Sequence, residues 1–281
     1  MDSLLSTAIE AAEAAARVHV EHFGKVGLDG AEEKAHSDFV SRVDLEAQDA
    51  AIEVIQRHHP DHQILAEEAR PGEARPGKAR PGGAAEEGRR SWPEKGGYLW
   101  IIDPLDGTTN YLHGHPQFAA SVGVGRMQTV EAGAVVAARS GERWWAQRGH
   151  GAFKNGLPIR VSALRTLKTA LIGTGFPFKE PDLVPRYLEQ FSRVLPASAG
   201  IRRAGSAALD LCYLAEGILD GFWEEAYLSP WDVAAGLVIL EEAGGIATRL
   251  NGGPIDLKNG SVLAANSPEI YRELKELMAA G

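Results

Sequence analysis

Two aspartates stand three positions apart in the stretch DPLDGTTNY, residues 103–111. The apolar run YLWII ahead of them predicts a buried strand over residues 98–103 that carries Asp103 at its end. Pro104 predicts a turn after the strand, so Asp106 is expected to point into the same small volume. Two carboxylates this close repel each other unless a cation neutralises them, and carboxylate oxygens suit Mg²⁺. The spacing therefore indicates a magnesium site, with an ordinary Asp-Pro or Asp-Gly turn as the alternative.

A candidate phosphate-binding element follows directly. Gly107, Thr108 and Thr109 are expected to open a helix, whose first backbone N–H groups and dipole attract anions. Acidic metal ligands beside such a helix start are the components of Mg²⁺-assisted phosphoryl chemistry. Cys212, the only cysteine, lies in the apolar stretch LDLCYL and is expected to be a buried thiol rather than a nucleophile. No Ser, His and Asp arrangement typical of nucleophilic catalysis is evident.

Hydrophobic periodicity predicts the elements that must position these groups. Helical spacing predicts helices over residues 5–23 and 44–59, and strand-like runs follow between residues 98 and 162. From about residue 169 strands alternate with helices, which are expected over residues 183–195, 206–216 and 231–245 and from Ser267 onward. This change of pattern predicts an α+β half, residues 1–150, and an α/β half, residues 151–281.

The composition narrows the class of protein. The 281 residues are 44% hydrophobic and 24% charged, which is typical of a globular chain with a substantial core. The net charge of −9 disfavours a general nucleic-acid or membrane-surface binder. One cysteine allows no intrachain disulfide, which suits a reducing compartment. The N-terminus lacks the pattern of a signal peptide, and no apolar run is long enough to span a membrane, so a cytoplasmic protein is expected.

Five segments resemble the inositol monophosphatase family of metal-dependent sugar-phosphate phosphatases. WIIDPLDGTTNY and SPWDVAAGLVILEEAGG resemble its two signatures, and AEE at residues 66–68 is similar to its Gly-Glu-Glu element, with Ala66 replacing the glycine. KAHSDFVSRVD is similar to its N-terminal element, and RRAGSAALDLCYLAEGILDGFWE to its substrate wall. The resemblance covers nearly the whole chain. It implies a layered αβαβα sandwich, of class α+β / α/β.

The resemblance also implies two or three Mg²⁺ ions. The ligands that it implies all offer hard oxygen atoms, and they are Glu67, Asp103, the backbone carbonyl of Leu105, Asp106 and Asp232. Glu67 and Thr108 would orient and deprotonate the attacking water, and Asp44 would hold the Thr108 hydroxyl. Glu68, Asp38 and Lys34 stay open between supporting roles at the site and ordinary surface positions.

The implied substrate-binding residues line one wall of the site: Asp106, Gly107, Thr108, Gly205, Ser206, Ala207 and Glu225. Glu225 stands seven positions before Asp232, the separation that the family shows, and the adjacent Glu224 is expected to be solvated. Carboxylates and backbone groups of this kind suit a polyol phosphate, because they hydrogen-bond adjacent hydroxyls.

An insertion separates two of the implied ligands. Glu67 and Asp103 are 36 positions apart, and the chain between them repeats EARPG, EARPG and KARPG. Recurrent Pro and Gly predict an irregular loop over residues 69–97. That segment holds seven Lys and Arg against four Glu. A passive insertion is one interpretation, and a basic flap that steers anionic substrate is the other.

Several functions follow from these patterns. The first is a Mg²⁺-dependent phosphomonoesterase acting on inositol monophosphate or a related polyol or sugar phosphate, with histidinol phosphate and fructose 1,6-bisphosphate as alternative substrates. Thr109-Asn110 favours the inositol type over nucleotide bisphosphatases, which often have Lys at the first of these positions. The alternative from another class is a regulatory binding protein that keeps the fold. The expected partners are a small phosphate ester and, by resemblance, a second copy in a homodimer, with no nucleic acid and no membrane.

Overall fold

The computed structural model describes residues 3–35, 38–68, 92–93, 96–177, 180–257 and 260–279. Most of the predicted insertion, residues 69–97, lies outside these ranges. The loop conformation expected for it therefore stays a prediction. The side chains of Lys34 and Asp38 are also outside the description, so their roles stay predictions.

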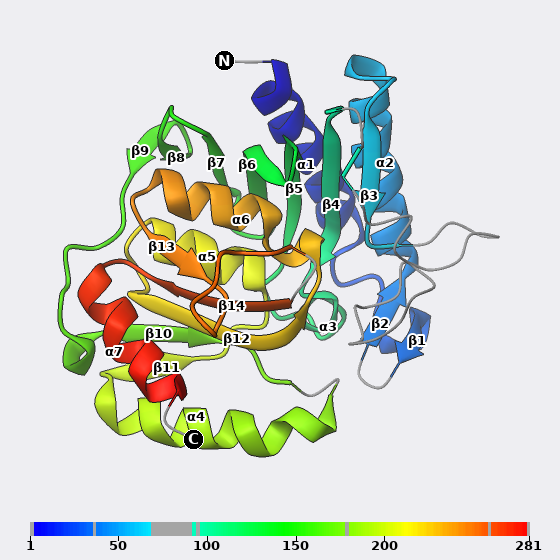
Figure 1. Ribbon diagram of the computed structural model, residues 1–281. Helices are drawn as coiled ribbons and strands as arrows, with labels where there is room; N and C mark the ends of the chain where they lie inside the picture. The colour runs from blue at the N-terminus through cyan, green and yellow to red at the C-terminus, as the bar shows by residue number, and fades with distance from the viewer. Residues whose placement is uncertain are drawn as a thin grey trace.

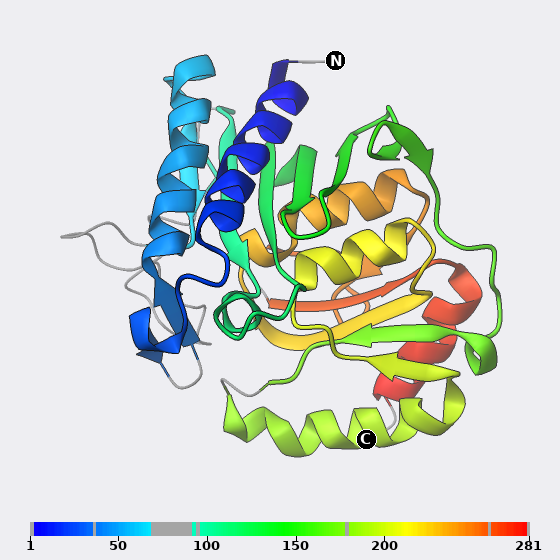
Figure 2. The same cartoon turned by 180° about the vertical axis from the view of Figure 1, so that it is seen from behind.

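Five layers follow one another through the molecule (Figure 1). Helices α1 (Ser3–His22) and α2 (Arg42–His58) cover the outer face of a seven-stranded sheet. Helices α5 (Ala207–Ala215) and α6 (Pro230–Glu242) lie between this sheet and a five-stranded one. Helices α4 (Val184–Ala197) and α7 (Pro268–Ala279) cover the far face, as the reverse view also shows (Figure 2). The predicted αβαβα sandwich is confirmed.

The first sheet contains the strand that carries Asp103. Its strand order is β3-β4-β5-β6-β7-β8-β9, with β3 parallel to β4 and the other pairs antiparallel. The strands are β3 (Gln63–Ala66), β4 (Leu99–Asp106), β5 (Ala119–Arg126), β6 (Thr129–Ala137), β7 (Glu142–Gln147), β8 (Ala152–Lys154) and β9 (Leu157–Ile159). The expected strand over residues 98–103 is therefore confirmed, but it continues to Asp106.

The second sheet has the order β11-β10-β12-β14-β13. Its strands are β10 (Leu171–Thr174), β11 (Gly200–Arg202), β12 (Gly221–Leu228), β13 (Ile246–Thr248) and β14 (Gly260–Ala265). The short elements are β1 (Ala31–Ala35), β2 (Asp38–Ser41), α3 (Thr108–Leu112) and three 3₁₀ turns, Leu28–Gly30, Leu167–Thr169 and Pro181–Leu183. Because β8 and β9 belong to the first sheet, the two sheets divide between Ile159 and Leu171 rather than at the expected residue 150.

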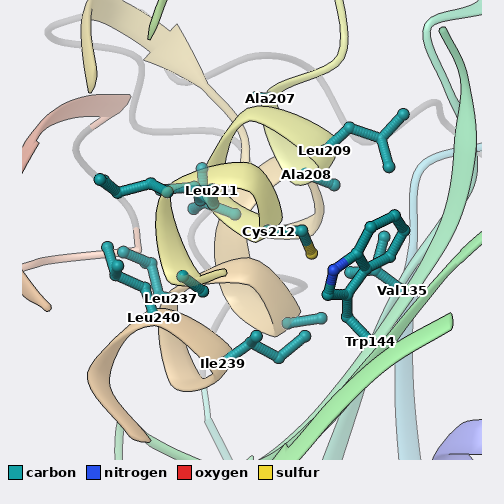
Figure 3. Close-up of a cluster of buried hydrophobic side chains, with 14 of the residues drawn as sticks. Val135, Trp144, Ala207, Ala208, Leu209, Leu211, Cys212, Leu237, Ile239 and Leu240 are labelled. Carbon is teal, nitrogen blue, oxygen red and sulfur yellow. The ribbon is translucent and has the colours of Figure 1, made fainter. Parts of the chain in front are cut away.

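The middle layer is apolar on all sides. Helix α6 approaches the first sheet so closely that a Cβ added at Gly133 would lie 2.8 Å from the Cα of Ala235, which requires glycine there. On the neighbouring helix, Cys212 packs among leucines and Trp144 (Figure 3). Cys212 is fully buried and burial raises the pKa of its thiol, as the sequence predicted for a structural cysteine. Among the described residues, no helix has both the length and the apolar character needed to span a bilayer.

Candidate metal and phosphate site

The end of β4 carries the first two predicted ligands. Asp103 is 1% exposed, and its Oδ1 accepts a hydrogen bond from the Leu105 N–H at 3.0 Å. The ladder between β4 and β5 shifts register between Asp103 and Asp106, so the intervening backbone bulges out of regular pairing. This bulge replaces the free turn that the sequence predicted, and it turns both carboxylates toward the middle layer.

The N-terminus of α5 holds the second of these carboxylates. Asp106 Oδ2 accepts hydrogen bonds from Ser206 Oγ at 2.5 Å and from the Ala208 N–H at 2.8 Å. Ser206 is also the N-cap of α5 and accepts from the Leu209 N–H at 3.3 Å. The structure therefore brings Ser206 and Ala207 beside Asp106, because an anion is stabilised by the free N–H groups that begin a helix.

The four predicted acidic ligands lie close enough together for their charges to interact. Burial raises the pKa of Asp103 well above its usual range, and the negative charges of Glu67, Asp106 and Asp232 raise it further. Burial likewise raises the pKa of Asp106 to about 6, although its bonds to α5 oppose the shift. Asp232 lies in the first turn of α6, where its Oδ2 accepts from the Ser229 N–H at 2.5 Å. Three segments distant in the sequence, which carry Glu67, the pair Asp103 and Asp106, and Asp232, thus contribute like charges to one place.

This donor set fits Mg²⁺ in its chemistry. Within the described part of the chain, no three acidic, histidine or cysteine side chains already close around a point as a finished cation cage. A divalent cation would remove the repulsion that raises the pKa of Asp103, and Mg²⁺ prefers such oxygen ligands while keeping several waters.

Thr108 lies beside this group in the first turn of α3. Its Oγ1 is 3.0 Å from Asp44 Oδ1 and 3.0 Å from the Leu105 carbonyl oxygen. Asp44 is 1% exposed, and its Oδ2 accepts from both the N–H and the hydroxyl of Ser41, which caps α2. The start of α2 therefore aims Asp44 at Thr108, as the resemblance implied.

Gln48 anchors the backbone of Glu68, a contact that the sequence-based expectations did not include. Its Nε2 donates to the Glu68 carbonyl at 2.8 Å, and its Oε1 accepts from the Glu68 N–H at 2.9 Å. The Glu67 N–H donates to the Ile102 carbonyl on β4 at 3.2 Å. Glu68 is buried rather than solvated, with 6% exposure. The only feature of the sequence that could have indicated this contact was Gln48 itself, a polar residue on the inward face of the predicted helix.

Two glycines shape the predicted substrate wall. Gly107 (φ +93°) and Gly205 (φ +90°) are left-handed, and a Cβ at Gly107 would lie 2.8 Å from the Gln117 carbonyl oxygen. Asn110 ties the two loops together, because its Nδ2 donates to the carbonyls of Gln117 at 2.7 Å and Ala204 at 2.9 Å. In the sequence, Asn110 served only to favour the inositol type over nucleotide bisphosphatases. Its positioning role was not predicted.

The structure separates Glu225 from this wall. Glu225 Oε1 pairs with Arg186 Nε at 2.6 Å, and its Oε2 accepts from Gln190 Nε2 at 3.0 Å, both on α4. Successive residues of a strand face opposite sides, and Trp223 on the same face of β12 packs in the outer core with α4 and α7. The predicted substrate contact of Glu225 is therefore not supported by the placement of its side chain.

Glu224 occupies the inner face instead. Phe222, two positions before it, packs in the core between the sheets. The Glu224 carboxylate lies directly on Gly175, where a Cβ would collide with it. Burial raises the pKa of Asp210 on α5, and the charges of Glu224 and Asp106 raise it further, which places both carboxylates near that residue. The alternation of Phe222 and Trp223 was the signal that could have distinguished the two glutamates.

Comparison with known proteins identifies the family. The protein-family model described as "Inositol monophosphatase family" matches residues 1–280 of this chain. "Putative Nus factor SuhB" of Neisseria meningitidis serogroup B is 39% identical over 280 residues, which cover 100% of this chain and 99% of that protein. "Inositol-1-monophosphatase" of Rhizobium meliloti is 38% identical over 276 residues, covering 98% and 96%. The crystal structure of the extragenic suppressor protein suhB from Bartonella henselae matches with a TM-score of 0.86 and 34% identity over the full length of both chains. Matched along its whole length in sequence and in structure, this chain belongs to the inositol monophosphatase family.

Proposed function

We propose that this protein is a Mg²⁺-dependent phosphomonoesterase that hydrolyses inositol monophosphate or a related polyol or sugar phosphate. The observation that carries the proposal is the group of carboxylates whose charges interact around the buried Asp103, namely Glu67, Asp103, Asp106 and Asp232. Family membership supports the same reaction class. The Rhizobium relative, whose name specifies inositol 1-phosphate chemistry, supports the substrate class.

The residues of the chain divide the proposed reaction among them. Glu67, Asp103, the Leu105 carbonyl, Asp106 and Asp232 would hold two or three Mg²⁺ ions. When bound, Mg²⁺ supplies positive charge that neutralises phosphate oxygens and acidifies water. Thr108 and Glu67 orient the attacking water and accept its proton. Asp44 accepts a hydrogen bond from the Thr108 hydroxyl, which leaves the Thr108 oxygen lone pairs available to the water.

The inner wall would recognise the alcohol. Glu224 replaces Glu225 in this proposal, because its carboxylate lies on the same side of the second sheet as Asp106. Ser206 and the backbone around Gly205 would supply further polar contacts. Adjacent hydroxyls of a polyol both donate and accept hydrogen bonds, so a wall of carboxylate and backbone groups favours such an alcohol over an apolar one.

A second candidate function comes from the Neisseria relative, whose name describes a putative Nus factor. We propose, as this alternative, a regulatory protein that joins a transcription complex through protein contacts, because the net charge of −9 disfavours direct binding to nucleic acid. A homodimer is proposed for either function. An Asp103→Asn variant that still joins a purified transcription complex while lacking turnover would establish the second role separately from the first.

The test of the enzymatic proposal is phosphate release with and without Mg²⁺. The panel contains inositol 1-phosphate, histidinol phosphate, fructose 1,6-bisphosphate and p-nitrophenyl phosphate. Inositol 1-phosphate is expected to give the highest kcat/KM. Asp103→Asn is expected to lower turnover more than tenfold without lowering the melting temperature, because an amide lacks the charge that Mg²⁺ needs and also relieves buried repulsion. Turnover of this variant within tenfold of wild type would remove Asp103 from the metal site, and no release from any ester would overturn the proposal.

A further inference from the structure

His19 is a buried histidine to which the proposed reaction assigns no role. It lies near the end of α1 with no exposed surface, and its ring is 6.0 Å from that of Tyr111 and 5.8 Å from that of Phe118. Its Nε2 is 2.7 Å from the Pro104 carbonyl oxygen. Because a carbonyl oxygen only accepts hydrogen bonds, Nε2 carries the proton and donates it.

The acceptor of this hydrogen bond belongs to a segment of β4 that is not regularly paired with β5. The register between β4 and β5 shifts between Asp103 and Asp106, so the backbone of Pro104 and Leu105 lies outside regular pairing. Leu105 is held from within the bulge, because its N–H donates a hydrogen bond to Asp103 Oδ1. Pro104 has no N–H to donate. Its carbonyl oxygen accepts the hydrogen bond from His19 on α1, 85 positions away.

His19 is itself held in place on its own helix. The Tyr111 hydroxyl donates to the His19 carbonyl oxygen at 3.0 Å, and the Phe23 N–H donates to the same oxygen at 2.9 Å. Among the described residues, the His19 Nδ1 has no hydrogen-bond partner. The ring therefore contributes a single donor, in a fixed direction, to the back of the bulge that carries the acidic ligands.

We propose that His19 is a positioning residue for the Mg²⁺ site, because its hydrogen bond to Pro104 fixes the bulge that presents Asp103, the Leu105 carbonyl and Asp106. This inference rests on the proposed function, because that function makes the bulge a metal-binding element. His19 touches neither substrate nor metal in this assignment, and it acts through the backbone of β4.

The test compares Mg²⁺ binding, measured by calorimetry well below the melting temperature, with phosphate release. His19→Leu fills the space without a donor, and His19→Gln keeps a donor at the end of the side chain. Removing a supporting partner of a metal ligand typically weakens binding 10–100-fold, so His19→Leu is expected to weaken Mg²⁺ binding at least about tenfold, and His19→Gln to recover most of it. His59→Leu is the matched control, because it removes another histidine of the N-terminal region, whose Nε2 lies 3.2 Å from Thr7 Oγ1 and away from the bulge, and it should leave Mg²⁺ binding unchanged.

A second measurement needs no variant. The Nε2–H resonance of His19 in the nitrogen NMR spectrum of the wild-type protein is expected to shift during Mg²⁺ titration, with the half-saturation found by calorimetry. Wild-type Mg²⁺ affinity in folded His19→Leu, or a resonance that stays constant up to saturating Mg²⁺, would overturn the role of His19. A wild-type protein that binds Mg²⁺ but cleaves no ester would overturn the proposed function and leave the role of His19 standing. A wild-type protein that binds no Mg²⁺ would overturn both.

Discussion

Glu224 and Glu225 are adjacent in the sequence and carry the same charge, but they lie on opposite faces of β12. Glu225 is buried against α4, where Arg186 and Gln190 satisfy its carboxylate. Glu224 faces the middle layer, close to Gly175 and Asp210. The family resemblance implied Glu225, but the alternation of side chains along β12, with Phe222 in the core between the sheets and Trp223 in the outer core, puts Glu224 on the inner face and Glu225 on the outer face.

Substitution of these two glutamates should separate recognition from stability. Glu224→Gln is expected to raise the KM for inositol 1-phosphate more than tenfold, because a hydrogen bond to a charged group contributes about 1.5–3 kcal/mol. The KM for p-nitrophenyl phosphate, which has no hydroxyls to bind, should change little. Glu225→Gln is expected to lower the melting temperature and leave both KM values near wild type. The reverse pattern would return the substrate contact to Glu225.

The carboxylate group also predicts a dependence of stability on pH. The folded-state pKa of Asp106 is raised to about 6 and that of Asp103 is raised as well, so both carboxyls favour the protonated form in the fold. The contribution of Asp106 to stability is complete below the unfolded pKa near 4 and is lost as the pH rises through about 6, and the contribution of Asp103 is lost in the same direction. Because Mg²⁺ needs the charged forms, the rise in melting temperature on adding Mg²⁺ should be larger at pH 7.5 than at pH 5. Asp106→Asn should flatten this difference, and equal rises at both pH values in the wild-type protein would contradict the coupling.

At the scale of elements, α2 supports the site at two points along its length. Its N-terminal cap orients Asp44 toward Thr108, and two turns later Gln48 holds the Glu68 backbone with two hydrogen bonds. One helix therefore sets the distance between the groups proposed to activate water. A rigid helix suits this task, because its rise per residue is constant.

Gln48→Leu is expected to lower both stability and kcat. It leaves the Glu68 N–H and carbonyl without their partners, which costs about 1–3 kcal/mol for each unsatisfied buried group, and it releases the segment that carries Glu67. Gln190→Leu on α4 is the matched control, since Gln190 is equally buried and hydrogen-bonds a carboxylate away from the site. Both variants should melt at lower temperature, measured by calorimetry, but only Gln48→Leu should lose turnover. Equal turnover in the two variants would show that Glu67 keeps its position without Gln48.

At the scale of the whole molecule, the site lies where the seven-stranded sheet meets the middle helical layer. β4 supplies Asp103 and Asp106, while the starts of α5 and α6 supply Ser206 and Asp232. A substrate there would contact both halves of the chain. The insertion over residues 69–97 interrupts this architecture in the sequence, between Glu67 and Asp103, and the backbone of Glu67 and Glu68 is anchored on β4 and α2.

Deletion of residues 72–82 should therefore leave the melting temperature and kcat near wild type. More than twenty residues still connect Glu67 to Asp103, and halving a flexible connection changes its closure free energy by only about 0.6 kcal/mol. If the basic segment steers anionic substrate, kcat/KM should fall at low salt and recover as salt screens the charges. Values of kcat/KM equal to wild type at every ionic strength would identify a passive insertion. A large loss of kcat would show that the repeat holds Glu67 in position.

The sequence by itself determined the long helices, the strand that ends in the acidic pair, the layered fold and the family. These features follow from local information, namely hydrophobic periodicity, capping residues and short motifs that keep their order along the chain. Ser206 and Ser267 mark helix starts in the structure as they did in the sequence. The identities of the four acidic groups near Asp103 could be proposed in the same way, because each belongs to a short recognisable segment.

Only the tertiary structure decided which side chains support that site. The bonds from Gln48 to Glu68, from His19 to Pro104 and from Asn110 to Ala204 join residues 20, 85 and 94 positions apart. Such pairings carry no periodic signal, since each depends on how whole elements pack rather than on neighbours in the chain. The contact of the Glu225 carboxylate with Gln190, 35 positions away on α4, was decided in the same way.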